Sequence, residues 1–247
     1  MALQKEFEKQ GNWLFKHRSY LPIIILVVGF YVYYHTKINP NIFFLENTKY
    51  EVYYEMFCLL VGLFGLFIRV YTVGYTPSNT SGRNTKQQVA DSLNTTGIYS
   101  IVRHPLYLGN FFMWFGVCLL TLNAWFIVAF CLLYWVYYER IMFAEEQFLQ
   151  KKFGNDFSEW AEKTPAFLPN FKQFVRPHIP FSWKKVLKKE KDGLLNLFLI
   201  FTLFNISAVF INPQNNYNYF LLVAFGVVVI TYSVLKFLKS KTNILNE

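Results

Sequence analysis

The sequence of 247 residues is poor in charge and in cysteine, and both shortages exclude common classes of protein. Charged residues make up 16% of the chain, against about 25% in a typical globular protein. The low charge excludes intrinsic disorder and coiled coil. The three cysteines, Cys58, Cys118 and Cys131, match no zinc-binding or disulfide spacing and lie in apolar stretches. We therefore interpret them as packing residues and expect no metal site.

Apolar and aromatic residues are abundant instead, at 54% and 21% of the chain, and they predict a membrane protein. A spanning helix needs about 17 to 25 apolar residues. Residues 20–36 and 53–75 each satisfy this length. Residues 106–138 and 194–235 are uncharged runs too long for a single span, so each is predicted to fold back on itself. The sequence thus predicts an all-α polytopic membrane protein with about six transmembrane helices.

The positions of the reversals and of the basic residues complete this topology. We place the two reversals at residues 121–124 and 212–216, where polar residues and Pro213 interrupt the apolar runs. Most Lys and Arg residues lie at the termini and in the connections 76–104 and 139–193. The positive-inside bias therefore predicts that the N and C termini face the cytoplasm. The net charge of +9 then reflects topology, and we expect no nucleic-acid partner.

The same patterns divide the chain into three parts. Residues 1–94 form an N-terminal transmembrane hairpin with a cytoplasmic loop, residues 95–170 a central core, and residues 171–247 a basic linker with a C-terminal transmembrane hairpin. The charged N-terminus, without a small-residue cleavage site after the first apolar run, favours an anchor over a removable signal peptide.

Two motifs in the central part could carry chemistry. Arg103, His104 and Pro105 directly precede the third span, where a proline suits the first helical turn. Glu145 and Glu146 follow the fourth span and lie near the membrane interface, where ionisable groups are costly. Taken separately, the first motif is equally typical of a snorkelling arginine before a membrane helix. The second is equally typical of a solvated helix face.

Together, the RHPLYLG sequence at residues 103–109 and the EEQFLQKKFG sequence at residues 145–154 resemble a known family. This family is the integral-membrane methyltransferases typified by isoprenylcysteine carboxyl methyltransferase and the phospholipid methyltransferases. The likeness covers residues 95–169. It implies that S-adenosyl-L-methionine is the cofactor and that it binds at the cytoplasmic mouth of the helices.

The resemblance also implies roles for individual residues. The cofactor-binding positions are His104, Pro105, Leu106, Tyr107, Phe112, Val117, Cys118, Leu119, Leu120, Glu145 and Glu146. The catalytic positions are His104, Glu146 and Lys163. His104 acts either as a general base or, more commonly for such a residue, as an orienting hydrogen-bond partner. The sequence departs from the family at Phe157 and Trp160, where tyrosines are expected, and at Lys163, where an arginine is expected. Lysine cannot reproduce a bidentate grip on a carboxylate.

The acceptor is predicted from the polar loop that precedes the first motif. Arg83 and Lys86 lie in a hydroxyl-rich and amide-rich stretch that could cradle a phosphate, and Arg103 and Lys163 are further substrate-binding candidates. A solvated loop attracted to anionic lipid is the alternative. A phosphate oxygen is already ionised at neutral pH and requires no strong base. We therefore expect O-methylation of a membrane-lipid phosphate.

Two further features narrow the source of that lipid. The loop resembles bacterial enzymes that methylate the 1-phosphate of lipid A. The composition, rich in Asn, Lys and Phe, suggests a bacterium with an AT-rich genome. We therefore expect an integral protein of a bacterial inner membrane with its active site facing the cytoplasm.

Three alternatives stay open at this point. Another lipid carboxyl or amine group could be the acceptor. An NADPH-dependent membrane reductase would share the Arg-His-Pro segment, although reductases commonly carry Glu where Asn110 follows Gly109 here. A transporter is disfavoured, because charges within the spans are confined to Glu55, Arg69 and the span ends.

Overall fold

The computed structural model describes residues 2–39, 45, 48, 50–77, 88–213, 215–242, 244 and 245. In this part, helices are joined by turns and loops, with one isolated bridge between Gly97 and Val175. The helices are α1 (Ala2–Lys16), α2 (Tyr20–Lys37), α3 (Tyr50–Gly74), η1 (Ile98–Ser100), α4 (Pro105–Leu119), α5 (Ala124–Phe153), α6 (Asn155–Lys163), η2 (Phe171–Gln173), α7 (Trp183–Ile211) and α8 (Tyr219–Lys241). The all-α prediction is confirmed.

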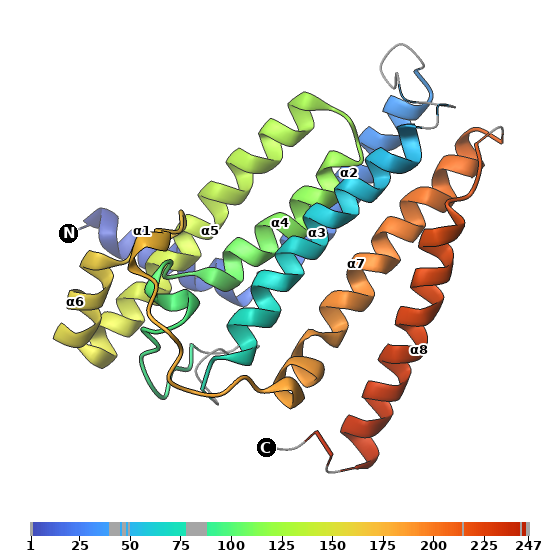
Figure 1. Cartoon of the computed structure of the whole chain (residues 1–247). Helices are drawn as coiled ribbons and strands as arrows, with labels where there is room; N and C mark the ends of the chain where they lie inside the picture. Colours follow the sequence, from blue (N-terminus) through green and yellow to red (C-terminus); the bar gives the residue numbers. More distant parts are fainter. Residues whose placement is uncertain are drawn as a thin grey trace.

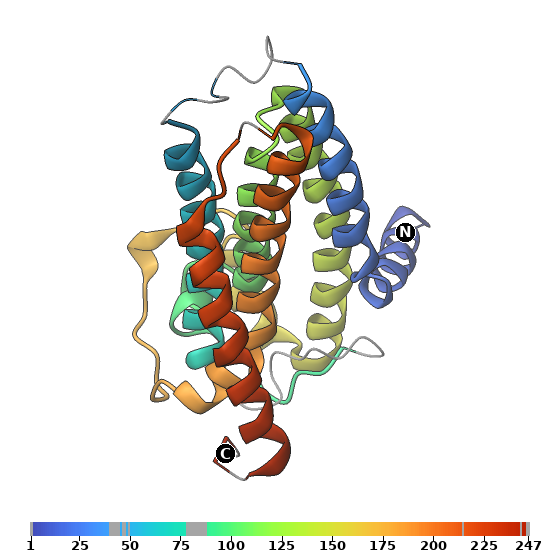
Figure 2. The ribbon, with the colours of Figure 1, turned by 90° about the vertical axis from the view of Figure 1, so that its right-hand side faces the viewer.

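The long helices run side by side as a bundle (Figure 1). The connections from α4 to α5 and from α7 to α8 lie at one end of it. The connections that lead into α4 and α7, together with α1 and α6, lie at the other end, which we call the motif end. Figure 2 shows α8 on the outside of the bundle, alongside α7. The two termini lie toward the motif end.

Four helices, α3, α5, α7 and α8, are long and apolar enough to cross a membrane. A fifth span results if α1 and α2, which meet at an angle of 72°, count as one bent span. Helix α4 has 15 residues and is shorter than a typical span. The structure therefore supports a membrane protein, whereas the number of six spans and the cytoplasmic termini stay predictions.

Both reversals lie where the sequence places them. Helix α4 ends at Leu119, and the Asn123 side chain caps α5 by accepting a hydrogen bond from the backbone N–H of Phe126 at 2.9 Å. Helix α7 ends at Ile211, and the Asn218 side chain caps α8 by accepting from the N–H of Leu221 at 3.2 Å. These caps satisfy backbone donors that lipid could not satisfy.

Glycines allow α3 and α4 to pack closely. A Cβ atom at Gly116 would lie 2.5 Å from the Cys58 carbonyl oxygen of α3. A Cβ atom at Gly109 would lie 2.6 Å from the Cγ atom of Arg69. Small residues at such interfaces let helix backbones approach in a membrane. The contact fixes α4, and with it the Arg-His-Pro motif at its start, against α3.

We expect Gly116→Ala to destabilise the protein by about 1–3 kcal/mol, because the added methyl group overlaps the backbone of α3. The matched control is Gly226→Ala on α8, where a Cβ atom meets nothing within 4 Å. Thermal unfolding in detergent checks this prediction. Equal melting temperatures for the two variants would contradict the close packing of α3 and α4.

Candidate functional site

The two motifs meet at the start of α4. His104 lies at the N-cap of α4 and is 7% exposed. Its Nε2 atom is 2.9 Å from Oε1 of Glu146 on α5, and its Nδ1 atom is 3.6 Å from Oε2 of Glu145. The imidazole is therefore held between two adjacent carboxylates. The prediction that the two separated stretches come together is confirmed.

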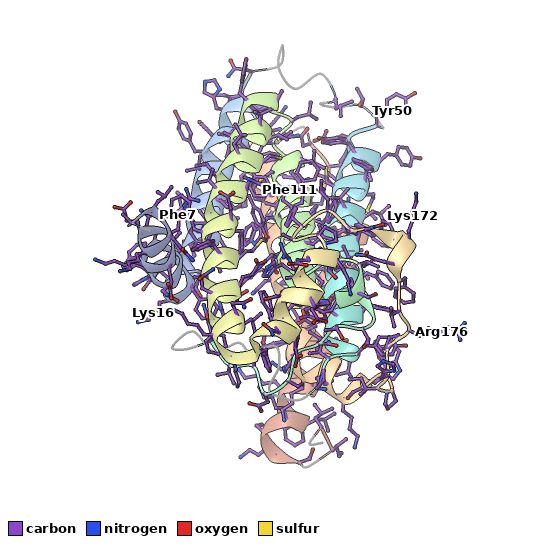
Figure 3. The ribbon with its side chains drawn as sticks, turned by 90° about the vertical axis from the view of Figure 1, so that its left-hand side faces the viewer. Phe7, Lys16, Tyr50, Phe111, Lys172 and Arg176 are labelled. Carbon is purple, nitrogen blue, oxygen red and sulfur yellow. The ribbon has the colours of Figure 1, made fainter. Side chains whose placement is uncertain are left out.

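A tyrosine cluster extends this contact along the two helices. The Tyr107 hydroxyl donates a hydrogen bond to Oε1 of Glu145 at 2.6 Å, and the Tyr134 hydroxyl donates to the Tyr107 carbonyl at 2.7 Å. The ring of Tyr138 lies between those of Tyr107 and Tyr134, with centroid distances of 4.8 and 4.2 Å. The neighbouring Phe111, labelled in Figure 3, packs edge-on against Tyr134, with ring centroids 5.2 Å apart. The site therefore has one aromatic wall.

The segment after α6 returns to hold the first motif in place. The backbone N–H groups of Arg103 and His104 donate to the carbonyls of Pro165 and Ala166, at 2.9 and 3.2 Å. Further along, the N–H of Gly97 donates to the Val175 carbonyl at 2.9 Å. These hydrogen bonds satisfy the backbone of an irregular segment beside the membrane, as burial requires. They also fix the direction in which His104 enters α4.

Arg103 spans the space between α5 and α6. Its Nη1 atom donates to the Ala161 carbonyl at 3.0 Å, and its Nε atom lies 3.2 Å from Oε1 of Glu146. Glu146 therefore faces both a guanidinium and an imidazole. Its charge is compensated within the site.

A cavity of about 430 Å³ opens beside these residues. Among the described residues, its lining includes the motif residues Arg103, His104, Pro105, Leu106, Tyr107, Glu145 and Glu146. Phe15 and Arg18, near the bend between α1 and α2, also line it, as do Phe157 and Trp160 of α6. The cavity lies in the size range of small-molecule sites.

Several residues predicted to bind the cofactor lie away from the cavity. Phe112 packs edge-on against Phe64, with ring centroids 5.0 Å apart. Val117, Cys118 and Leu120 are buried in the packing between helices, and the Leu119 carbonyl accepts a hydrogen bond from the Tyr54 hydroxyl. The structure brings together the first-turn residues of α4 but not these.

The predicted substrate-binding residues also separate into groups. Arg103 lines the cavity. Lys163 is exposed at the end of α6 and is not among the residues lining the cavity. Arg83 and Lys86 lie outside the described residues, so the predicted phosphate cradle stays a prediction. In the described part, no three His, Cys, Asp or Glu side chains are grouped to hold a metal ion.

The cavity contains a polar network that the sequence analysis did not assign. Arg69 of α3, Asn110 of α4 and Glu190 of α7 all line it. Nε and Nη2 of Arg69 each donate to Glu190 at 2.8 Å, and Nη1 donates to the Asn110 side chain at 2.7 Å. The signal in the sequence was the isolated charge of Arg69 inside an apolar run.

A comparison with known protein families matches the central part of the chain. Residues 55–156 match the family model of phospholipid methyltransferases, and this segment contains Arg69, both motifs and the tyrosine cluster. This central segment is therefore similar to the phospholipid methyltransferases. It accounts for α4 and α5 and for most of α3, but not for the α7 wall that contributes Glu190.

The curated proteins that are similar to this chain include two descriptions. The chain is 33% identical over 114 residues to a protein-S-isoprenylcysteine O-methyltransferase of Saccharomyces cerevisiae, covering 45% of this chain and 47% of the relative. It is 29% identical over 137 residues to the Xenopus laevis protein of the same description, covering 53% and 47%.

The second description is the nickel-cobalt-cadmium resistance protein NccN of Alcaligenes xylosoxydans xylosoxydans. The chain is 32% identical to NccN over 118 residues, covering 47% of this chain and 52% of the relative. The chain thus spans about half the length of the curated relatives it matches. No solved structure matches the chain.

The surroundings of His104 set its protonation. Burial lowers the pKa of His104, hydrogen bonding to Glu145 and Glu146 raises it, and the net change is upward from 6.5. Because the pKa is higher in the folded protein, protonated His104 stabilises the fold. This contribution is fully present below about pH 6.5 and is lost as the pH rises through the folded-state pKa.

We therefore expect the melting temperature of the wild-type protein to exceed that of His104→Asn by a larger margin at pH 6 than at pH 9, by about 2 °C or more. Thermal unfolding of both proteins in the same detergent at the two pH values measures this margin. A margin that stays constant, or one that grows with pH, would contradict the ion pairing of His104.

Proposed function

We propose that the protein is an S-adenosyl-L-methionine-dependent methyltransferase that acts on a membrane lipid, with a phosphate oxygen as the acceptor. The observation that carries this proposal is the contact of His104 with Glu145 and Glu146 beside a cavity of about 430 Å³. The family of residues 55–156 and the O-methyltransferase descriptions of the relatives support it.

The cavity residues fit a small cationic cofactor. Carboxylates of Glu145 and Glu146 and the aromatic rings of Tyr107 and Tyr138 attract positively charged groups. The Arg103 guanidinium in the same lining suits a carboxylate. When bound, S-adenosyl-L-methionine supplies a methyl group on a positively charged sulfur. The residues of the chain then orient the two reactants and exclude water.

The geometry favours an orienting role for His104 over that of a general base. Both ring nitrogens face carboxylates, and the upward shift of the His104 pKa favours the protonated imidazole. A protonated imidazole cannot accept a proton from the acceptor. An acceptor that is already an anion needs no such base, and this supports an ionised oxygen over an amine.

The charge of the cavity also suits an anionic acceptor. The described lining residues include four basic side chains, Arg18, Arg69, Arg103 and Lys189, and three carboxylates, Glu145, Glu146 and Glu190. A lipid phosphate, such as the 1-phosphate of a lipid A-like molecule at the cytoplasmic face of a bacterial inner membrane, meets this requirement. A lipid carboxylate is the second candidate, favoured by the isoprenylcysteine O-methyltransferase descriptions of the relatives.

We expect His104→Ala and Glu146→Ala each to weaken S-adenosyl-L-methionine binding by at least about tenfold, because each removes one partner of a partly buried charged contact. Isothermal titration calorimetry measures the dissociation constant. The matched control is Glu159→Gln, which neutralises an exposed carboxylate on α6. Unchanged binding in both alanine variants would exclude this cofactor site.

The acceptor can be identified by incubating the protein with a labelled methyl donor and total bacterial membrane lipid, followed by mass spectrometry. We expect the label in a phosphate methyl ester. Label in a carboxyl ester or a methylated amine would overturn the phosphate assignment while retaining the methyltransferase. Absence of any labelled lipid would count against lipid methylation itself.

A further inference from the structure

The ion pair between α3 and α7 points to a second recognition element in the cavity. We propose that Arg69 binds the anionic oxygen group of the acceptor and that Glu190 and Asn110 are positioning residues that hold its guanidinium. This inference rests on the proposed function and extends it by naming the residue that selects for an anion. It applies equally to a phosphate or a carboxylate.

The geometry of the pair holds the guanidinium plane in place. Two Arg69 nitrogens bind the two oxygens of Glu190, and the third binds Asn110. The three residues come from α7, α3 and α4, so the plane is fixed from separate helices. Glu190 is 4% exposed. Side-chain entropy is thus already lost before a ligand arrives, which favours binding.

Arg69 retains capacity for a ligand. A guanidinium has five N–H groups, and contacts with described residues engage three of them. The side chain also lines the cavity. The planar arrangement of N–H groups matches the oxygens of a phosphate or carboxylate. Lys163, which the sequence analysis predicts to bind the substrate, is exposed and is not among the residues lining the cavity.

The ion pair with Glu190 allows the Arg69 guanidinium to lie between apolar helices. Burying an uncompensated guanidinium between apolar helices would be strongly destabilising. Pairing with Glu190 offsets part of this cost, and the remaining N–H groups stay available. The excess of basic over acidic side chains in the described lining keeps the cavity favourable to an anion.

The reaction itself favours this arrangement. A lone pair of the acceptor oxygen forms the bond to the methyl carbon, and the carbon–sulfur bond breaks with its electron pair passing to sulfur. The acceptor thereby loses one negative charge. Arg69 then holds the substrate more tightly than the methylated product, which assists release. Its N–H groups serve best on the oxygens that do not attack, because a hydrogen bond to the attacking oxygen would reduce its nucleophilicity.

The test uses the full-length protein in detergent micelles with dioctanoyl phosphatidic acid as the anionic probe and dioctanoylglycerol as the uncharged control. Binding is followed by fluorescence of Trp114 and Trp160, which line the cavity. The main variant is Arg69→Gln with Glu190→Gln, which removes the guanidinium without leaving a buried unpaired charge. The matched control is Glu159→Gln, which neutralises an exposed carboxylate on α6 and leaves Arg69 and Glu190 unchanged.

We expect the wild-type protein to prefer phosphatidic acid over dioctanoylglycerol. The double variant is expected to bind phosphatidic acid at least about tenfold more weakly, with S-adenosyl-L-methionine binding changed by less than about threefold. Glu159→Gln is expected to retain the preference. An unchanged affinity for phosphatidic acid in the double variant would overturn the proposal and leave the pair as a structural link between α3 and α7.

If the double variant does not fold, Arg69→Lys provides the test, because it keeps the charge and removes the planar fork. A loss of at least about threefold in phosphatidic acid binding, with intact S-adenosyl-L-methionine binding, is expected. An unchanged affinity overturns the proposal, as does a wild-type protein without preference for the anionic lipid. Failure of the methyltransferase assignment is separate, since it would show as absent cofactor binding.

Discussion

The pairing of one buried imidazole with two adjacent carboxylates connects the parts of this site. His104 lies at the start of α4, and Glu145 and Glu146 lie on α5, about two turns beyond the apolar part of that helix. At a membrane interface an ionised group is stable only where partners replace the water it loses. Each charge here has such a partner, and the contact therefore holds α4 and α5 in one relative position. The direction of the nearby Tyr107 and Arg103 side chains depends on that position.

The site is wider than the segment that carries the family signature. Residues 55–156 supply the two motifs and the aromatic wall, whereas Glu190 comes from α7 and Phe15 from α1. Residues outside the matched segment therefore contribute to the cavity lining.

The spacing of residues along α4 explains which predictions match the cavity. Pro105, Leu106 and Tyr107 occupy the first helical turn and line it. Val117 lies twelve residues after Pro105, and at 1.5 Å per residue this corresponds to about 18 Å along the helix axis. The cavity lining on α4 includes Trp114 but not Val117, which is buried and contributes to the packing between helices. Assigning a family motif to positions along a helix does not by itself show how far along that helix the binding site extends.

The sequence by itself determined the membrane class, the helical reversals and the two motifs, because hydrophobic run length, capping residues and local motif spacing are properties of neighbouring residues. Only the tertiary structure decided that Arg69 joins Glu190 and Asn110 in the same cavity. Arg69 and Glu190 are 121 residues apart in the chain. Their contact depends on how α3 packs against α7, and no local pattern encodes that arrangement. An isolated charge in an apolar run signals that a partner is needed, but the fold alone identifies the partner.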